Sequence, residues 1–302
     1  AFLPETLDSI LASDYPNFEV VVVDDGSKDA SYRIACDYAK KDQRVRAYTQ
    51  PNGGACAARN QAVRLAKGEI ILPFDADDKM SETFVSDAVH VILSDMKIKA
   101  VCPRAEYFGN RKGEWKLPPF SRKLLARKNM IPICALYRKS DWERVGGYDE
   151  HIVAREDWTF WIAMLKDGGK VVALSRVSVY YRVRTGSKRV SDRSLKRKLI
   201  DALNARHPEF FERELGGPLH YCRSWSVLLN RIYRLFHPRK VYVASDFRTL
   251  TDYVKALPAL FKYDCGTVIY KGRNELREMD WHGTKVVVKS FRVPNLINRI
   301  AY

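Results

Sequence analysis

In the first eighty residues, apolar positions recur with the periods that are typical of helices and strands. Segments 4–12, 30–40 and 55–66 carry apolar side chains at helical spacing, and segments 19–23, 45–48 and 69–74 read as short apolar strands. Ser81 is predicted to cap the helix that follows them. Repeated strand–helix units predict an α/β fold whose mostly parallel sheet is covered on both faces.

The second half of the chain has a different pattern. Residues 188–239 are basic and helical in character, and within them the stretch 222–240 is amphipathic. Strand patterns return at 267–270, 276–281 and 285–291. We therefore expect three parts, 1–187, 188–239 and 240–302.

Two acidic clusters stand where predicted strands end. Asp24-Asp25-Gly26-Ser27 follows one strand, and Asp75-Ala76-Asp77-Asp78 follows another. Open α/β sheets bind ligands at the carboxyl ends of their strands. Carboxylates two residues apart can hold Mn²⁺ or Mg²⁺, which typically bridges protein and diphosphate. A lone motif of this kind is more often a polar turn that begins a helix, but two acidic strand ends favour a nucleotide site.

Charge and cysteine content narrow the partners. The 302 residues carry a formal charge of +16, which favours an anionic partner such as nucleic acid, a phospholipid surface or a phosphorylated substrate. The sequence has no helix-turn-helix, zinc-finger or ribonucleoprotein motif, so nucleic acid is disfavoured. The six cysteines form no CxxC pair, which indicates reduced thiols in a cytoplasmic protein. No apolar run approaches the roughly 20 residues that span a bilayer, and no signal peptide is recognisable.

Five motifs together resemble the inverting family 2 glycosyltransferases of the GT-A fold. They occur in the family's order at 21–27, 52–60, 74–78, 146–150 and 155–158, and the resemblance covers roughly residues 1–190. It implies a metal-dependent enzyme that moves a sugar from a nucleotide-diphosphate sugar, with uridine favoured as the nucleoside. The implied acceptor is a glycan or a lipid-linked glycan of the bacterial cell envelope, such as lipopolysaccharide or capsule.

The resemblance also implies roles for individual residues. Asp25 would bind the nucleobase, with Asp24 beside it, and Arg59 and Asn60 would order the nucleotide site. Asp75 would bind the ribose or the metal, and Asp77 would bind the metal with support from Asp78. Asp157 would be the general base, with Glu156 next to it. A positioned carboxylate can take the proton of the attacking hydroxyl, and attack from the opposite face inverts the anomeric centre. The segment 102–132 would shape the donor and acceptor pockets.

Several of these residues have a plain structural alternative. Glu156 and Asp157 suit the start of any helix. Glu156, Trp158 and Trp161 are the residues expected to line the acceptor site, but the two tryptophans could equally belong to the core, and Arg59 could be a surface charge. The stretch 222–240 could lie on the inner face of the bacterial inner membrane or pack on its own domain with a solvated basic face.

Both ends of the sequence depart from the family pattern. Family members begin with a strand before the first helix, and without it we expect an impaired enzyme. Residues 240–302 resemble the opening strands of the lipopolysaccharide core kinases, with Lys289 at the position of a phosphate-binding lysine. No HRD-like or DFG-like motif follows, so we expect no kinase activity.

These departures leave other functions in competition with sugar transfer. The first alternative is a fusion fragment whose tail belongs to a core kinase. Others are an inactive transferase scaffold, which the intact acidic set argues against, a nucleic-acid binder, and a sugar-lipid kinase.

Overall fold

The computed structural model describes residues 2–152, 155–184 and 193–220, together with the backbone of three strands at 267–271, 274–281 and 284–291. The chain divides into two compact units. The first holds every element from α1 to α9, and the second holds β9, β10 and β11. None of the helices in this described part is long and apolar enough to cross a bilayer.

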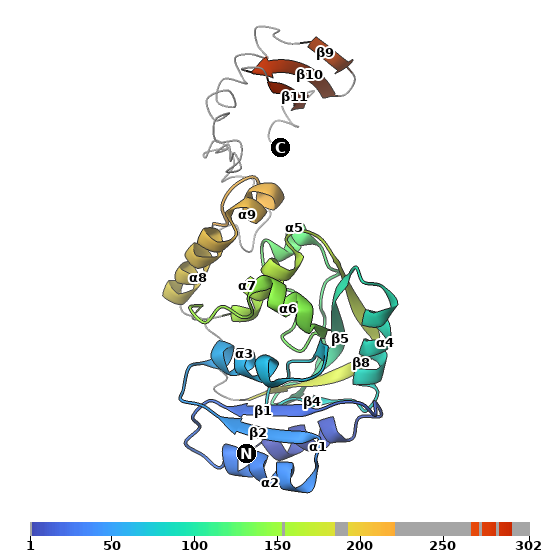
Figure 1. The fold of residues 1–302 in the computed structure, drawn as a ribbon, viewed down its shortest axis with the longest axis vertical. Coiled ribbons are helices and arrows are strands. Elements are labelled where there is room, and N and C mark those ends of the chain that lie inside the picture. The colour runs from blue at the N-terminus through green and yellow to red at the C-terminus, as the bar shows by residue number, and fades with distance from the viewer. Residues whose placement is uncertain are drawn as a thin grey trace. The chain divides into compact units, whose positions relative to one another are not determined.

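The first unit begins with a parallel strand pair between helices. Its elements are α1 (Leu3–Leu11), β1 (Val20–Asp24), α2 (Ser31–Lys41), β2 (Val45–Thr49) and α3 (Ala55–Leu65). β1 and β2 run parallel, and α3 lies on the opposite face of the pair from α1 and α2 (Figure 1). One core cluster between α1, α2 and the two strands buries Leu7, Val20, Ala35 and Val45. The helices and strands predicted up to residue 66 are confirmed to within one or two residues.

The predicted strand over 69–74 is much shorter in the structure. β3 covers only Ile70–Ile71 and pairs antiparallel with β7 (Tyr137–Arg138). Pro73 has no N–H to donate, so the ladder cannot continue through it. Leu72 and Phe74 still pack against the core as loop residues.

Ser81 does not cap the next helix, so that prediction is wrong. β4 (Lys79–Met80) precedes α4 (Phe84–Ser94), whose N-cap is Thr83 without a side-chain cap bond. The backbone N–H of Ser81 donates to the carbonyl oxygen of Ser178, which continues the β4 ladder, and its hydroxyl is buried without a hydrogen-bond partner. Sheet pairing therefore draws Ser81 away from the helix start.

A four-stranded sheet has the order β4-β8-β5-β6. β5 (Ile98–Gly109) and β8 (Lys170–Val183) are parallel, whereas β4 with β8 and β5 with β6 (Gly113–Trp115) are antiparallel. The pairing is therefore mixed, and the expectation of a mostly parallel sheet is corrected. The β5–β6 hairpin turns within a few residues, and such a turn can only join antiparallel strands.

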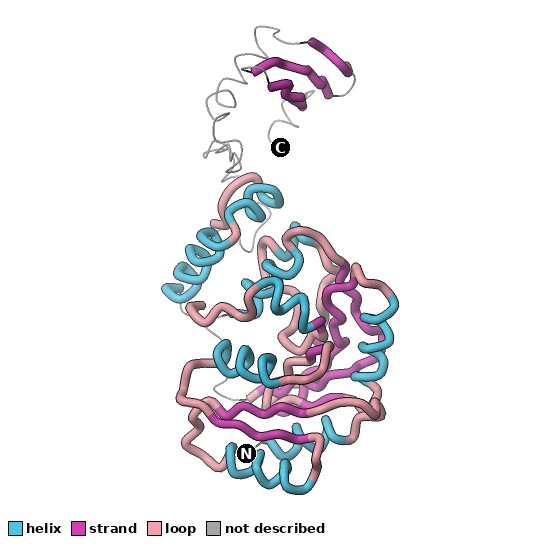
Figure 2. Tube along the Cα trace, in the orientation of Figure 1, coloured by secondary structure: helices cyan, strands magenta, loops and turns pink. Residues whose placement is uncertain are grey.

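The remaining helices form a second layer with an aromatic core. They are α5 (Arg122–Leu125), α6 (Lys139–Val145), α7 (Glu156–Leu165), α8 (Arg193–Arg206) and α9 (Pro208–Leu215). Leu203, Phe210 and Phe211 from the last two helices are buried in the same cluster as Trp161 and Tyr137. Figure 2 shows α8 and α9 as consecutive helices of this part. A boundary at 187 would cut this core, and the compact unit continues through Leu215.

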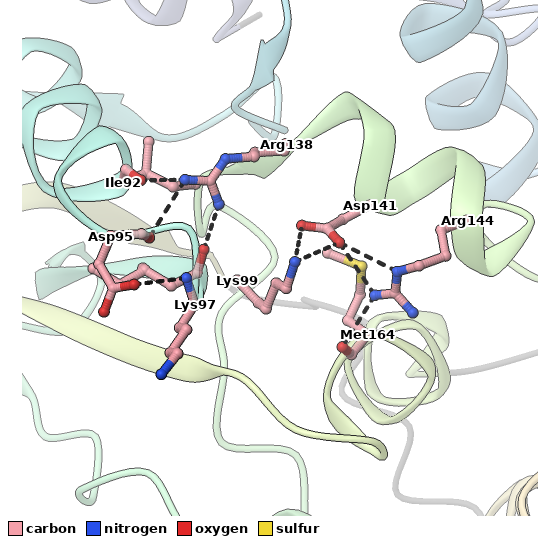
Figure 3. A network of polar contacts seen from close by, with 9 residues as sticks. Ile92, Asp95, Lys97, Lys99, Arg138, Asp141, Arg144 and Met164 are labelled. Carbon is pink, nitrogen blue, oxygen red and sulfur yellow. Dashed lines mark hydrogen bonds and ion pairs between the residues drawn. The ribbon is translucent and has the colours of Figure 1, made fainter.

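A polar network ties the two layers together (Figure 3). Arg138 is buried and donates to the carbonyl oxygens of Ile98, at 2.6 Å, and Ile92. Asp141, at the start of α6, accepts a hydrogen bond from Lys99 Nζ on β5 at 2.9 Å. These bonds fix α4, β5 and α6 relative to one another.

The second unit shows three antiparallel strands in the order β11-β10-β9. β9 spans Thr267–Lys271, β10 spans Asn274–Trp281 and β11 spans Thr284–Phe291. The three strand predictions in the tail are confirmed. The stretch 222–240 lies outside the described residues, and Lys289 is described only as a backbone position in β11.

Candidate active site

Two acidic residues after β3 are each paired with an arginine. Asp75 Oδ1 accepts a hydrogen bond from Arg59 Nη2 at 3.0 Å. Asp77 Oδ2 lies 2.6 Å from Arg184 Nη2, and the backbone carbonyl of Asp77 accepts from Arg182 Nε at 2.7 Å. Sequence reasoning missed Arg182, at the end of β8, and Arg184, just after it, because the pairing of β8 with β4 brings them to this loop.

Asp78 is used inside the fold. Its side chain is buried, and Oδ1 accepts the backbone N–H of Arg182 at 2.8 Å. Burial raises the pKa of this carboxyl to about 7, with Arg182 opposing the shift and Asp75 and Asp77 adding to it. This arrangement supports a structural role for Asp78, in place of the metal-supporting role that the family resemblance implied.

Arg59 joins two segments that lie far apart in the sequence. Nη1 of this α3 residue bonds Glu156 Oε1 at 2.6 Å, while Nη2 holds Asp75. Its guanidinium carbon lies 5.9 Å from the ring centroid of Tyr148. The two carboxylates raise the pKa of Arg59 against the effect of burial, so it stays charged. The surface-charge alternative is therefore wrong, since Arg59 is a partly buried bridge.

Asp157 has the surroundings of a proton acceptor. Its Oδ2 accepts a hydrogen bond from Asn129 Nδ2 at 2.5 Å. Burial raises the pKa of this carboxyl to about 7; Glu156 adds to the shift and Arg59 opposes it. Just before α7, Arg155 has a φ of 51°, a left-handed conformation that side chains other than glycine rarely adopt. A carboxyl with a pKa near neutrality is suited to general base catalysis.

Asn60 is buried and holds a loop through its side-chain amide. Its Oδ1 accepts the backbone N–H of Tyr148, and its Nδ2 donates to the carbonyl oxygen of Tyr148 and to Glu150 Oε1, each at 2.8 Å. Gly147 has a φ of 79°, and a Cβ there would come within 2.7 Å of Asn60 Oδ1. Asn60 thus fixes the loop 146–150 against α3, and its expected part in ordering the nucleotide site stays a prediction.

The acidic end of β1 organises the loop before α3. Asp25 accepts the backbone N–H groups of Gly53, at 2.8 Å, and Gly54, at 2.7 Å. Asp24 accepts the N–H of Ser27 at 3.0 Å and is buried. The expected contact of Asp25 with a nucleobase stays a prediction, and the structure adds a second role for Asp25, because its carboxylate orders the start of the helix that carries Arg59.

The two tryptophans of α7 belong to the core. Trp158 is 2% exposed, and its Nε1 donates to the carbonyl oxygen of Leu125 at 2.7 Å. Trp161 is fully buried, with its ring in contact with Tyr137 and Phe160. The expectation that Trp158 and Trp161 line an acceptor site is corrected, because a side chain closed off from solvent cannot stack on a sugar.

The described residues therefore bring one cluster together. Arg59, Asp75, Glu156 and Asp157 converge from α3, the loop after β3 and the start of α7, and Asp77 lies in that same loop. Within the described part of the chain, no group of three or more His, Cys, Asp and Glu side chains is arranged to hold a metal ion. Open α/β sheets bind their ligands at the carboxyl ends of strands, and this acidic cluster has that placement, as a site of the nucleotide-binding class would.

The comparisons with known proteins agree with this class. The model of glycosyl transferase family 2 matches residues 1–147 of this chain. The structure is similar to residues 1–349 of TarS from S. aureus in complex with UDP-GlcNAc. That likeness has a TM-score of 0.56 at 17% identity, and it covers 94% of this chain and 95% of the other. At that identity it shows the fold alone.

Curated relatives match shorter stretches. The glycosyltransferase EpsJ of Bacillus subtilis, described as uncharacterized, is 42% identical over 80 residues, which are 26% of this chain and 23% of EpsJ. The chondroitin synthase of Pasteurella multocida is 27% identical over 194 residues, 61% of this chain and 19% of the synthase. The chain thus spans about a quarter or less of the length of these two relatives.

Proposed function

We propose that this chain is a metal-dependent inverting glycosyltransferase that moves a sugar from a UDP-sugar to a hydroxyl group of a cell-envelope glycan or glycolipid. The observation that carries the proposal is the placement of Asp157, which accepts a hydrogen bond from Asn129 and follows Glu156, the residue that Arg59 bridges to Asp75; burial raises the pKa of the Asp157 carboxyl. The match to the family 2 model supports sugar transfer, and the similarity to TarS, which binds UDP-GlcNAc, supports a uridine donor. The similarity to a chondroitin synthase supports a polysaccharide acceptor.

In this mechanism the acceptor oxygen attacks the anomeric carbon while the bond from that carbon to the diphosphate breaks. Asp157 takes the hydroxyl proton, and attack opposite the leaving group inverts the centre. Asn129 holds Asp157 Oδ2 in place, and Arg59 keeps part of the population ionised because its charge opposes the rise in pKa. The diphosphate leaves as an anion with the nucleoside.

Asp75 and Asp77 would hold the divalent cation. Two carboxylates are a small donor set, but Mg²⁺ and related ions commonly take one or two carboxylates and complete their shell with substrate phosphates. Both side chains are partly exposed, and their arginine partners can be exchanged for a cation. When bound, the metal ion would neutralise the charge that develops on the diphosphate.

The decisive experiment compares Asp157→Asn with the wild-type chain, using Asp167→Asn as a matched control because Asp167 is an exposed residue just after α7. Turnover of UDP-sugar to product should fall by about 10² to 10⁴ in Asp157→Asn, the usual contribution of acid–base catalysis, with UDP affinity nearly unchanged. Unchanged turnover would exclude Asp157 as the base. Donor hydrolysis that is never stimulated by acceptor would favour the inactive-scaffold alternative.

The finer points of partner and location also belong to the proposal. A lipid-linked acceptor would place the enzyme on the inner face of the cytoplasmic membrane, with the basic stretch 222–240 against anionic headgroups. Binding to vesicles that contain phosphatidylglycerol, lost in 0.5 M salt, is expected, because such contacts are screened at about one Debye length. The kinase resemblance of 240–302 stays a prediction, and ATP turnover that disappears in Lys289→Ala would support it.

A further inference from the structure

Positive charge accumulates without compensation around α5. Residues 115–140 include seven lysines and arginines and no carboxylate. Three of the seven are engaged, since one pairs with Glu214 at 3.7 Å and two donate to backbone carbonyl oxygens; these are Arg122, Arg138 and Lys139. Three others stand at the end of α5 and just after it, and within the described part of the chain their side chains have no ion-pair partner. We call them the α5 cation set: Lys123, Arg127 and Lys128.

The local backbone forces these cations together. The helical turn continues past the end of α5, because the N–H of Lys128 donates to the carbonyl oxygen of Leu124 at 3.0 Å. Lys123 and Arg127 are therefore four residues apart on one face of a helical turn, a spacing at which like charges repel. An anion bound here would remove that repulsion.

Arg127 is more than a solvated surface charge. The residue is half-buried, and its Nε is shielded from solvent without a hydrogen-bond partner among the described residues. A shielded donor on a charged group costs free energy when it stays unpaired. A ligand with several acceptor oxygens would meet this donor, and arginine binds phosphate with two parallel hydrogen bonds.

Two hydrogen bonds place the α5 cation set beside the proposed base. The carbonyl oxygen of Leu125 accepts from Trp158 Nε1 at 2.7 Å, and Asn129 Nδ2 donates to Asp157 Oδ2 at 2.5 Å. Arg127 and Lys128 lie in the chain between these two contacts, so this segment runs along the start of α7.

The two carboxylates at the start of α7 divide the site into two sides. Glu156 is held by Arg59, the residue that also holds Asp75, whereas Asp157 is held by Asn129. Arg155, two residues before Asp157, is exposed and has a φ of 51°, and backbone strain of this kind clusters at ligand sites. Positive charge therefore follows the Asp157 side, away from the acidic loop assigned to the donor.

We propose that the α5 cation set binds a phosphate group on the acceptor, near the hydroxyl that is glycosylated. A phosphate group offers up to two charges and three terminal oxygens, enough for Arg127 and a lysine at once. A flat membrane surface fits less well, because it does not reach a shielded Nε as a small group does. The assignment to the acceptor rests on the proposed function, because it needs Asp157 to be the base.

The test uses the whole chain with glucose 6-phosphate as the probe and glucose as its neutral counterpart, both titrated by calorimetry. The wild-type chain should bind the phosphorylated sugar at least about tenfold more tightly than glucose. Arg127→Gln and Lys128→Gln should each weaken binding of the phosphorylated sugar about tenfold, the loss of one charge-assisted contact. Arg33→Gln is the matched control, since Arg33 is an exposed arginine of α2, at the opposite end of the first unit from α5 (Figure 1). It should stay within about twofold, because distant charges are screened.

Lys128→Arg keeps the charge and should retain most of the affinity, which separates a lost charge from a disturbed fold. The proposal is overturned if glucose binds as well as glucose 6-phosphate, if both glutamine variants bind the probe like the wild type, or if Arg33→Gln weakens binding as much as they do. Displacement of the probe by UDP with Mn²⁺ would place it in the donor site and would also overturn the proposal.

Two further measurements on the same samples separate this proposal from its neighbours. Binding to vesicles that contain phosphatidylglycerol is compared in the same variants. If Arg127→Gln and Lys128→Gln weaken vesicle binding but leave probe binding unchanged, the α5 cation set is a membrane contact and the phosphate site is overturned. Absence of UDP binding with Mn²⁺, together with probe binding that depends on the α5 cation set, would overturn only the proposed function. UDP binding without such probe binding would overturn only the phosphate site.

Discussion

Replacement of Asn60 by alanine should destabilise the first unit strongly. Asn60 is 3% exposed, and its amide satisfies both the N–H and the carbonyl oxygen of Tyr148. The alanine variant leaves these two backbone groups buried and unpaired, at about 1–3 kcal/mol each. Glu150 can turn to water and adds little. We therefore expect a loss of about 3 kcal/mol in the free energy of unfolding.

Urea denaturation followed by tryptophan fluorescence measures this loss, provided that the slope with denaturant stays unchanged. Gln61→Ala is the control, since Gln61 is the next residue on α3 and, among the described side chains, hydrogen-bonds only Arg64, in an exposed position. It should stay within about 0.5 kcal/mol of the wild type. A loss below about 0.5 kcal/mol in Asn60→Ala would refute the reasoning.

Gly147→Ala offers an independent check of the same loop. The new Cβ would lie 2.7 Å from Asn60 Oδ1, and the residue has a φ of 79°. The strain should cost about 1–3 kcal/mol. In the double variant with Asn60→Ala the clash with Oδ1 is gone, so the two losses should be less than additive. Strict additivity would mean that the two residues do not share this contact.

Three further predictions concern the site and its surroundings. The kcat/KM of the wild type should rise with pH up to about 7 and then level off, because a protonated Asp157 cannot accept another proton. Arg59→Gln should move this rise to higher pH, because Arg59 lowers the pKa of Asp157. A rise at the same pH in both proteins would contradict the coupling between the two residues. Asp77→Asn should abolish the Mn²⁺-dependent part of UDP binding in calorimetry, and equal affinity with and without Mn²⁺ in both proteins would argue against a metal at Asp77. Ser81→Ala should change the stability by less than about 0.5 kcal/mol, whereas loss of a true helix cap would cost about 1 kcal/mol in the same urea titration.

Local sequence patterns were sufficient for the first half of the domain. The periods that predict α1 to α3 and β1 to β2 act over a few neighbouring residues, and the structure follows them closely. The acidic ends of β1 and β3 were also readable, because a run of apolar residues ending in carboxylates needs no knowledge of the partner strand. The family resemblance added the role of Asp157, which the spacing alone does not give.

Tertiary pairing decided what each of these residues contacts. Arg59 and Glu156 are 97 positions apart, and Arg182 and Arg184 reach the loop of Asp77 only because β8 pairs with β4. The burial of Trp158 and Trp161, and the use of α8 and α9 to complete their core, likewise depend on distant segments. Periodicity reports which face of an element is apolar, but the partner of that face is set by packing across the whole domain.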